Sequence, residues 1–251
     1  MMNFIILGDG HVGRPISEIF AYDNTVVKYD IDGFHNKPDD FKPDGIVVCL
    51  PTPERADGSC DYSIIEKVLN EVNLYNVPVL IKSTIDIDAY TSLKERYNIT
   101  YAPEFLRERH PNDALDTKDI FIGGMDVDFW LPILKEVYPL FVSFTVCEIE
   151  ELILIKYIRN SYLATKVTFF NEIYQLCDRM NLNYDNIKIQ VAKDERIGYS
   201  HMDVPGYHGL GYSGSCLPKD VKAFMHMSKK LGYEQTLLNT VKNINDKLRD
   251  D

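Results

Sequence analysis

The residues whose types and spacing could do chemistry lie closest together between Gly214 and Asp220. This segment reads Gly-Ser-Cys-Leu-Pro-Lys-Asp, so a thiol, an ammonium and a carboxylate fall within five residues. Cys216 is a candidate nucleophile, because a thiolate can hold a reacting carbonyl carbon in a covalent intermediate. The nearby Lys219 would favour the thiolate form of such a cysteine. A buried, inert cysteine is an equally good interpretation of these residues taken alone.

A dinucleotide-binding pattern opens the chain. An apolar run at residues 3–7 is followed at once by Gly-Asp-Gly-His-Val-Gly, and residues 15–22 continue with helical spacing. A second apolar run, residues 25–29, ends in Asp30, 22 residues after Gly8. In this arrangement the glycines and the helix start approach a pyrophosphate, and the acid binds ribose hydroxyls. Because a carboxylate at Asp30 would repel a 2′-phosphate, the predicted cofactor is NAD rather than NADP.

Composition excludes several classes of protein. The chain has 251 residues, of which 45% are hydrophobic, which suits a globular protein with one large or two modest domains. A net charge of −11 disfavours a nucleic-acid partner, and the apolar runs are too short to cross a membrane. Five cysteines without metal-type spacing argue against a disulfide framework and a zinc site. Without a secretory-type N-terminus, we expect a cytoplasmic protein.

The N-terminal half alternates apolar runs with helical patterns. Further strands are predicted at residues 45–50, 77–82, 99–102 and 120–123, with helices between them and at residues 127–138. This order predicts an α/β fold with a Rossmann-type doubly wound parallel sheet. Ligands of such sheets bind beyond the carboxyl ends of the strands, where Pro51, Thr84 and Glu104 follow. The predicted cofactor-binding residues are Gly8, Gly10, His11, Val12, Gly13, Asp30, Pro51, Thr52, Thr84 and Glu108.

The pattern changes after residue 146. Residues 148–180 contain no Pro or Gly and read as one long connecting helix, or as two in near continuity. Residues 187–191 and those from 219 onward also look helical, with a loop of five glycines between residues 198 and 214. The charged residues 246–251 are expected to fray. We therefore predict an NAD-binding Rossmann domain at residues 1–147 and a smaller all-α central domain at residues 148–251.

Charged and amide side chains elsewhere allow more than one interpretation. Lys156 and Asn160 are four apart, so they would share a helix face and could stabilise an oxyanion, or could simply be solvated. Glu104 and Glu108 could share proton transfer, or could pair with neighbouring arginines. Arg196 is equally ambiguous by itself.

Taken together, these segments resemble the UDP-glucose/GDP-mannose dehydrogenase family. The resemblance covers nearly the whole chain in order, and two of its strings, P-E-F-L-R-E and G-S-C-L-P-K-D, are highly specific. The matching segments are Gly8–Gly13, Pro51–Pro53, Lys82–Thr84, Pro103–Glu108, Lys156 with Asn160, Asn171–Glu172, Arg196–Gly198 and Gly214–Asp220.

The resemblance implies a four-electron oxidation of a nucleotide-sugar primary alcohol to a carboxylate, of the UDP-glucose to UDP-glucuronate type, with two NAD per turnover. Cys216 would form a thiohemiacetal and then a thioester. Lys156 and Asn160 would stabilise the oxyanion, Asp220 and Thr84 would place a water molecule, and Glu104 would assist hydrolysis of the thioester. The substrate-binding residues implied are Glu108, Arg196, Phe105, Leu106 and Lys219. Arg196 would reach the neighbouring subunit's substrate, which implies a homodimer packed through the long helix.

The chain also departs from the family pattern. His11 stands where a tyrosine is usual, and residues 85–88 replace an expected Pro-Gly. Family members continue into a third domain that grips the nucleotide, whereas this sequence ends after the central part. Two other hypotheses therefore stay open. One is a two-electron dehydrogenase of the hydroxyacid type in which Cys216 is unused, and the other is an NAD-binding protein without turnover.

Overall fold

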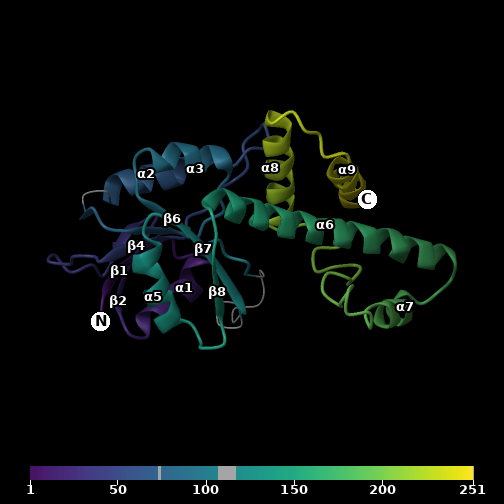
Figure 1. The fold of residues 1–251 in the computed structure, drawn as a ribbon. Coiled ribbons are helices and arrows are strands. Elements are labelled where there is room, and N and C mark those ends of the chain that lie inside the picture. Colours follow the sequence, from purple (N-terminus) through teal and green to yellow (C-terminus); the bar gives the residue numbers. More distant parts are fainter. Residues whose placement is uncertain (73–74, 107–116, 251) are drawn as a thin grey trace. The chain divides into compact units, whose positions relative to one another are not determined.

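The structure is a computed structural model that describes residues 1–72, 75–106 and 117–250. Residue 250 is described by its backbone alone. The chain divides into two compact units (Figure 1). The first unit comprises Met1–Arg55 and Cys60–Lys156, and the second comprises Ala56–Ser59 and Tyr157–Asp251. None of the helices in the described part of the chain combines the length and the apolar character that crossing a bilayer requires.

An eight-stranded sheet forms the centre of the first unit, in the strand order β3-β2-β1-β4-β5-β6-β7-β8. The alternation of short apolar runs with helical segments favours this layout, because each crossover helix returns the chain to the same edge. The strands are β1 (Asn3–Leu7), β2 (Thr25–Asp30), β3 (Gly33–His35), β4 (Gly45–Val48), β5 (Val79–Ile81), β6 (Ile99–Tyr101), β7 (Asp119–Gly124) and β8 (Ser143–Val146).

The predicted α/β class is confirmed, but the sheet is mixed rather than wholly parallel. Strands β2, β1, β4, β5 and β6 run parallel, with Leu7 in register with Val48 and Val48 with Ile81. β3 pairs antiparallel with β2, and β7 pairs antiparallel with β6. β3 and β8 were not predicted from the sequence. The parallel strands still bring their carboxyl ends to one edge, where ligands of such sheets bind.

Four described helices cover this sheet. Helices α1 (Gly13–Ala21) and α5 (Val127–Val137) lie on one face, and α2 (Ser63–Val72) and α3 (Ile87–Lys94) lie on the other (Figure 1). The core under α1 and α5 is aromatic: Phe4 packs edge-on against Phe20 with ring centroids 5.1 Å apart, and lies 5.8 Å from the ring of Trp130. These rings fix the first strand and the first helix, which together present the glycine turn.

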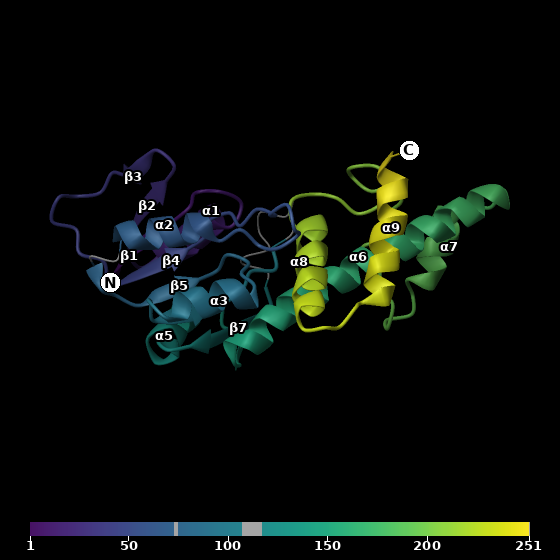
Figure 2. The same ribbon diagram turned by 90° about the horizontal axis from the view of Figure 1, so that it is seen from above.

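The second unit is helical. It contains most of α6 (Ile149–Arg179), followed by α7 (Tyr184–Val191), α8 (Leu217–Lys230) and α9 (Thr236–Asp250). The predicted long helix is thus one uninterrupted element of 31 residues. Its residue Ala164 packs with Val221 of α8 and with Leu238 of α9, whereas α7 packs near the far end of α6 (Figure 2). Residues 246–250, expected to fray, are part of α9.

Candidate functional site

The glycine turn after β1 has the close packing that a dinucleotide-binding turn needs. Gly8 has φ +99°, and a Cβ placed on it would lie 2.6 Å from the carbonyl oxygen of Cys49. A Cβ on Gly13 would lie 1.8 Å from the carbonyl oxygen of Gly8. Any side chain at these two positions would therefore force β1, the turn and α1 apart. Both glycines serve the packing of strand against helix.

The middle of the same turn is open. A Cβ on Gly10 would meet nothing within 4 Å, and both Gly10 and His11 are exposed. Val12 occupies the N-cap position of α1 without a capping side chain, and the first turn of α1 carries no acidic residue. Backbone N–H groups at such a helix start favour a phosphate. These residues fit the pyrophosphate of a dinucleotide, which they would hold through the backbone.

Asp30 lies at the end of β2, held in place by the turn. Its Oδ2 accepts a hydrogen bond from the backbone N–H of Asp9 at 3.0 Å, and its Oδ1 accepts one from Ile31 at 2.7 Å. The side chain of Asp9 pairs with Lys28, with Nζ and Oδ1 2.8 Å apart. The carboxylate of Asp30 is therefore fixed beside the glycine turn, where a cofactor ribose would bind.

Other predicted residues follow β4 and β5 at the same sheet edge. Thr52 is buried, Pro51 is exposed and Thr84 is half-buried. Ser83 joins the two strand ends, because its hydroxyl donates to the carbonyl oxygen of Leu50 at 2.7 Å. The segment around Thr84 is thereby anchored before α3 begins.

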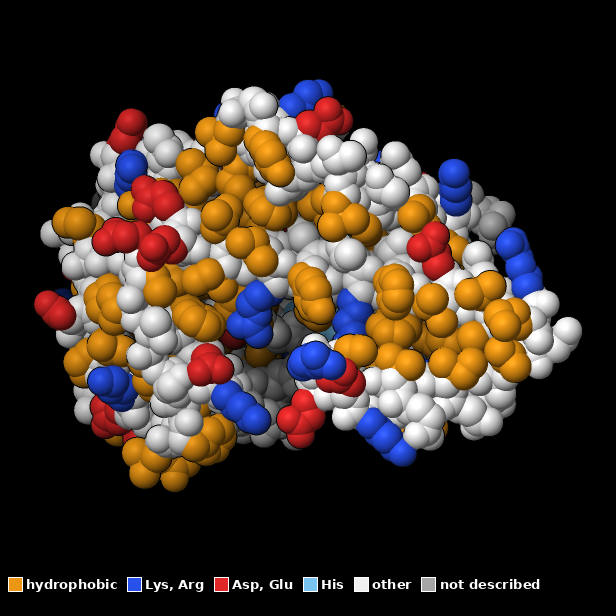
Figure 3. Space-filling model, turned by 45° about the vertical axis from the view of Figure 1, so that its right-hand side comes forward, with side chains coloured by type: hydrophobic (Ala, Val, Ile, Leu, Met, Phe, Trp, Pro, Cys, Tyr) orange, Lys and Arg blue, Asp and Glu red, His pale blue; other side chains and the backbone are white. Residues whose placement is uncertain are grey.

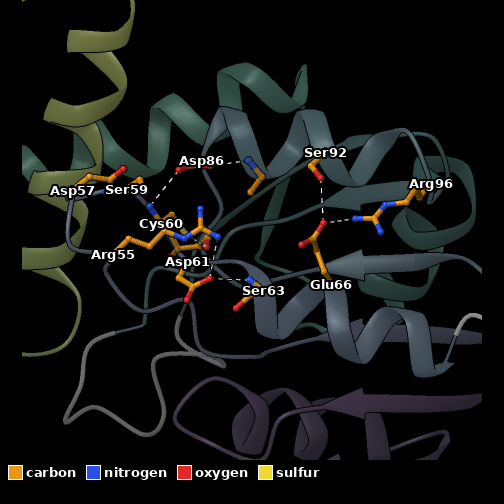
Figure 4. A network of polar contacts seen from close by, with 12 residues as sticks. Arg55, Asp57, Ser59, Cys60, Asp61, Ser63, Glu66, Asp86, Ser92 and Arg96 are labelled. Carbon is orange, nitrogen blue, oxygen red and sulfur yellow. Dashed lines mark hydrogen bonds and ion pairs between the residues drawn. The ribbon is translucent and has the colours of Figure 1, made fainter.

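Asp86 extends this anchoring from the segment that departs from the family pattern. It is buried, and its Oδ1 caps α3 by accepting the N–H of Ala89 at 2.8 Å (Figure 4). Its Oδ2 accepts the N–H of Cys60 at 3.3 Å. An ion pair between Arg55 and Asp61 closes the loop that leads to Cys60, with a guanidinium nitrogen 3.1 Å from Oδ1 of the aspartate. Where a Pro-Gly was expected, a carboxylate thus connects two loops of the sheet edge.

Glu104 and Lys156 meet in the first unit. Lys156 is buried, and its Nζ donates to the backbone carbonyl oxygen of Glu104 at 2.5 Å while lying 5.0 Å from the ring centroid of Phe105. The carboxylate of Glu104 forms an ion pair with Lys82, which is also buried. Leu106 packs against the hydrophobic core. Glu108 lies outside the described residues.

In the second unit, Asp220 is a buried carboxylate with a partner on each oxygen. The side-chain amide of Asn160 donates to its Oδ2 at 2.5 Å, and Nζ of Lys219 lies 2.6 Å from its Oδ1. The N–H of Asp220 donates to the carbonyl oxygen of Cys216 at 2.9 Å, as in the first turn of α8. A carboxylate that an amide holds in place therefore lies one helical turn from the predicted nucleophile.

Cys216 is the exposed cysteine, at the N-cap position of α8, with its Sγ 3.6 Å from the hydroxyl of Ser215. Cys49, Cys60 and Cys177 are buried, and Cys147 is half-buried. Exposure leaves the Cys216 thiol accessible to a substrate or a reagent. The prediction that Cys216 is the nucleophile is compatible with this placement.

Two asparagines that sequence reasoning did not assign hold the loop before Cys216. Asn245 of α9 accepts from the N–H of Tyr212 at 2.6 Å and donates to its carbonyl oxygen at 3.1 Å. Asn171 of α6 accepts the N–H of Gly211 at 2.9 Å. Gly211 itself has φ +74°. These contacts span 33 and 40 residues, so no local sequence pattern reveals them.

Arg196 is exposed, and its guanidinium pairs with Asp194 at 2.6 Å. The loop around it is fixed by Lys166 of α6, which donates to the carbonyl oxygens of Ile197 at 2.7 Å and of Gly198 at 3.0 Å. Burial lowers the pKa of Lys166. The guanidinium therefore extends from a loop whose backbone is held by the long helix.

This sheet, glycine turn and acid are the features of a Rossmann-type NAD-binding domain. Residues 34–142 match the NAD binding domain, and residues 150–247 the central domain, of the UDP-glucose/GDP-mannose dehydrogenase family. The chain belongs to that family, and the recognition from sequence is confirmed.

Individual relatives agree with this assignment. The chain is 33% identical over 213 residues to a UDP-glucose 6-dehydrogenase of Rickettsia conorii (strain ATCC VR-613 / Malish 7), a match that covers 79% of this chain and 48% of that protein. It thus spans about half the length of that relative. Among solved structures, a UDP-glucose dehydrogenase from Pyrobaculum islandicum superposes with a TM-score of 0.83 at 25% identity, over 98% of this chain and 68% of the other.

A 3-hydroxyisobutyrate dehydrogenase from Mycobacterium tuberculosis has a similar fold over more of its own length. The TM-score is 0.75 at 18% identity, and the match covers 100% of this chain and 94% of the other.

Proposed function

We propose that this chain carries the NAD-binding and thiol-bearing parts of a nucleotide-sugar dehydrogenase that oxidises a primary alcohol to a carboxylate. The observation that carries the proposal is the group of Cys216, Asp220 and Asn160: an exposed thiol one helical turn from a buried carboxylate that an amide holds. A simple alcohol dehydrogenation needs no thiol there, whereas passage through an aldehyde to an acid does. The functional division we propose is residues 1–147 for the cofactor and residues 148–251 for the central domain.

The residues supply distinct parts of this chemistry. NAD, when bound, accepts one hydride in each of the two oxidations. Cys216 adds to the aldehyde carbon to give a thiohemiacetal, and loss of the second hydride leaves a thioester. Lys156 and Asn160 stabilise the oxyanion, and Asp220 orders a water molecule together with Thr84. Glu104 takes a proton from the water that hydrolyses the thioester, and the thiol of Cys216 is regenerated.

The remaining predicted residues would bind ligands. In the sequence, Phe105 follows Glu104 and Lys219 precedes Asp220. We propose that the sugar nucleotide is contacted by these two residues, Phe105 and Lys219, together with Leu106, Glu108 and Arg196. A cytoplasmic location is also proposed, which the free state of all five cysteines supports, because a reducing compartment keeps thiols unpaired.

We further propose that the chain forms a homodimer through α6. Within the second unit, large apolar side chains of α6 and of the residue that follows it are about half exposed. They fall on one stripe, which consists of Ile158, Tyr162, Phe169, Leu176 and Met180. At 100° per residue, these five positions lie within an arc of about 40° on the helix surface. Hydrophobic side chains are gathered at the right of Figure 3, over the helical unit. An exposed apolar stripe of this kind is typical of a protein interface.

The test is the number of NADH molecules formed per substrate molecule. Purified protein is incubated with excess NAD and a limiting amount of each of several UDP- and GDP-sugars. We expect two NADH per substrate consumed, and Cys216→Ser should end the reaction before acid is formed. Cys147→Ser, which changes a half-buried thiol outside the proposed site, is the matched control. One NADH per substrate, unchanged in Cys216→Ser, would instead establish the two-electron dehydrogenase.

A further inference from the structure

A buried ion pair joins the ends of two neighbouring strands in the first unit. Lys82 directly follows β5, is 2% exposed, and pairs through Nζ with Oε1 of Glu104. Glu104 comes three residues after β6 ends, and only 12% of its side chain is exposed. The backbone of Lys82 is itself fixed, because its N–H donates to the carbonyl oxygen of Val48 at 2.9 Å.

Among the described residues, the other titratable groups that face this pair are neutral or donate to other atoms. Burial raises the pKa of the Cys49 thiol to about 12 and raises the pKa of the Tyr138 phenol well above its usual value. Both groups are therefore uncharged at neutral pH. Lys156 reaches the same residue from α6, but its ammonium donates to the backbone carbonyl oxygen of Glu104. Within the described residues, Lys82 is thus the cation that the structure pairs with this carboxylate.

Such a pair is a costly way to stabilise a fold. Removing two charges from water opposes folding, and apolar residues of similar volume in place of a buried ion pair are often neutral or stabilising. The strand before Lys82 reads Val-Leu-Ile, so methionine or leucine would extend its apolar run without interruption. A buried ammonium at a strand end, beside a carboxylate at the ligand-binding edge, is more typical of a functional site.

We propose that Lys82 is a positioning residue that holds the carboxylate of Glu104 in the orientation needed for hydrolysis of the thioester. This inference rests on the proposed function. In that step a water oxygen bonds to the acyl carbon, the carbon–sulfur bond breaks, and Glu104 takes a proton from the water. The sulfur leaves as the thiolate of Cys216. An ammonium bound to one carboxylate oxygen fixes the rotation of the group, so that its second oxygen has a defined direction in which to accept the proton.

The first measurement separates hydride transfer from hydrolysis. In rapid-mixing experiments, Lys82→Met should form NADH at close to the wild-type rate and then stall as an acyl-enzyme, detected as added mass on Cys216 after acid quench. We expect hydrolysis to slow by about 10²-fold, the usual scale for loss of a general base. Lys94→Met, a surface lysine on α3 that is 4.0 Å from Glu150, is the matched control.

A double-mutant cycle tests whether Lys82 acts through Glu104. Glu104→Gln alone should slow hydrolysis, and adding Lys82→Met to it should change the rate by less than about threefold. This double variant also removes both buried charges, so it keeps the test valid if Lys82→Met alone folds poorly. The proposal would be overturned if Lys82→Met lowered the hydrolysis rate by the same factor in wild type and in Glu104→Gln. It would also be overturned if Lys82→Met hydrolysed the thioester at the wild-type rate.

The contact between Lys82 and Glu104 can also be tested without turnover. Isotope-edited infrared spectra of wild type minus Glu104→Gln isolate the carboxylate band of Glu104, and this band should shift or vanish in Lys82→Met. An unchanged band would mean that Lys82 does not hold this carboxylate. If wild type yields one NADH and no acyl-enzyme, the proposed function fails, while the infrared band still reports on the pair. If wild type yields two NADH and the cycle shows no coupling, only the role of Lys82 fails.

Discussion

Asn160 donates a hydrogen bond from its side-chain amide to Oδ2 of Asp220 at 2.5 Å, which joins two residues 60 positions apart in the sequence. The second oxygen of the carboxylate lies 2.6 Å from Nζ of Lys219. Because Asp220 is completely buried, these two contacts fix both the position and the rotation of its carboxylate. The remaining lone pairs of the two oxygens have defined directions in which they can accept a hydrogen bond from water or from a substrate hydroxyl.

Asp220→Asn tests this arrangement with almost no change in volume. The amide removes the negative charge and places a donor against the donor of Asn160, so we expect kcat to fall by about 10²–10⁴-fold. The free energy of unfolding should fall by about 1–3 kcal/mol, because Asn160 loses its acceptor and Lys219 loses the negative charge with which it pairs. NAD affinity, measured by calorimetric titration, should stay within about threefold of wild type. Asp246→Asn, which changes an exposed pair with Lys242, is the control, and equal effects of both variants would contradict the prediction.

Two glycines of the cofactor turn should respond differently to the same substitution. Gly13→Ala puts a Cβ 1.8 Å from a backbone oxygen, so both stability and NAD affinity should fall. Gly10→Ala puts its Cβ into open space, so the thermal midpoint should stay within about 2 °C of wild type while NAD binding weakens by tenfold or more. Calorimetry and NAD titration on each variant check this. Normal NAD affinity in a well-folded Gly10→Ala protein would show that the pyrophosphate does not approach this turn.

The sequence was sufficient for the parts of the fold that have a strong period or a complete motif. Residues 3–30 contain a strand, a glycine turn, a helix and a terminal acid, and each of these is present. β3 and β8 have three and four residues, too few for a clear alternation of apolar and polar positions. The antiparallel direction of β7 is likewise not encoded in a local pattern, because it depends on how the chain returns to the sheet.

Candidate site residues that belong to a motif could be predicted from the sequence, whereas residues that act through distant contacts could not. Motif residues such as Cys216 and Asp220 could be named from their order along the chain. Lys82 lay within a matching segment but received no role, although a lysine that closes an apolar strand was a visible signal. Asn245 could not be identified, because its importance comes from two hydrogen bonds to a backbone 33 residues away.

The five cysteines should differ strongly in their rate of alkylation. Cys216 is exposed, whereas burial raises the pKa of Cys49 to about 12. Because the thiolate is the reactive form, a raised pKa and burial both make the Cys49 thiol slow to react at pH 8. Iodoacetamide at pH 8 should therefore label Cys216 first, as read by peptide mass mapping. Faster labelling of Cys147, whose pKa burial also raises, would contradict the assignment.

Asn245→Ala should destabilise the protein although the residue lies near the end of the last helix. The substitution leaves the buried N–H and C=O of Tyr212 without these partners, which costs about 2–4 kcal/mol for the two groups together. Asn243→Ala, at an exposed position of the same helix, should stay within about 0.5 kcal/mol of wild type. Chemical unfolding followed by fluorescence measures both. A similar small effect for the two variants would mean that α9 does not hold the loop before Cys216.

The apolar stripe on α6 gives the last prediction, which concerns assembly. If two copies of the chain contact each other through this stripe, sedimentation velocity should give twice the chain mass of 28.9 kDa. The stripe consists of Ile158, Tyr162, Phe169, Leu176 and Met180. Phe169→Glu places a charge in the middle of the stripe, where burial without a partner is unfavourable, so this variant should sediment as a monomer. Leu237→Glu changes an exposed apolar residue on α9, outside the stripe, and should stay dimeric. Dimers in both variants would exclude the stripe as the contact, and a monomeric wild type would exclude the dimer itself.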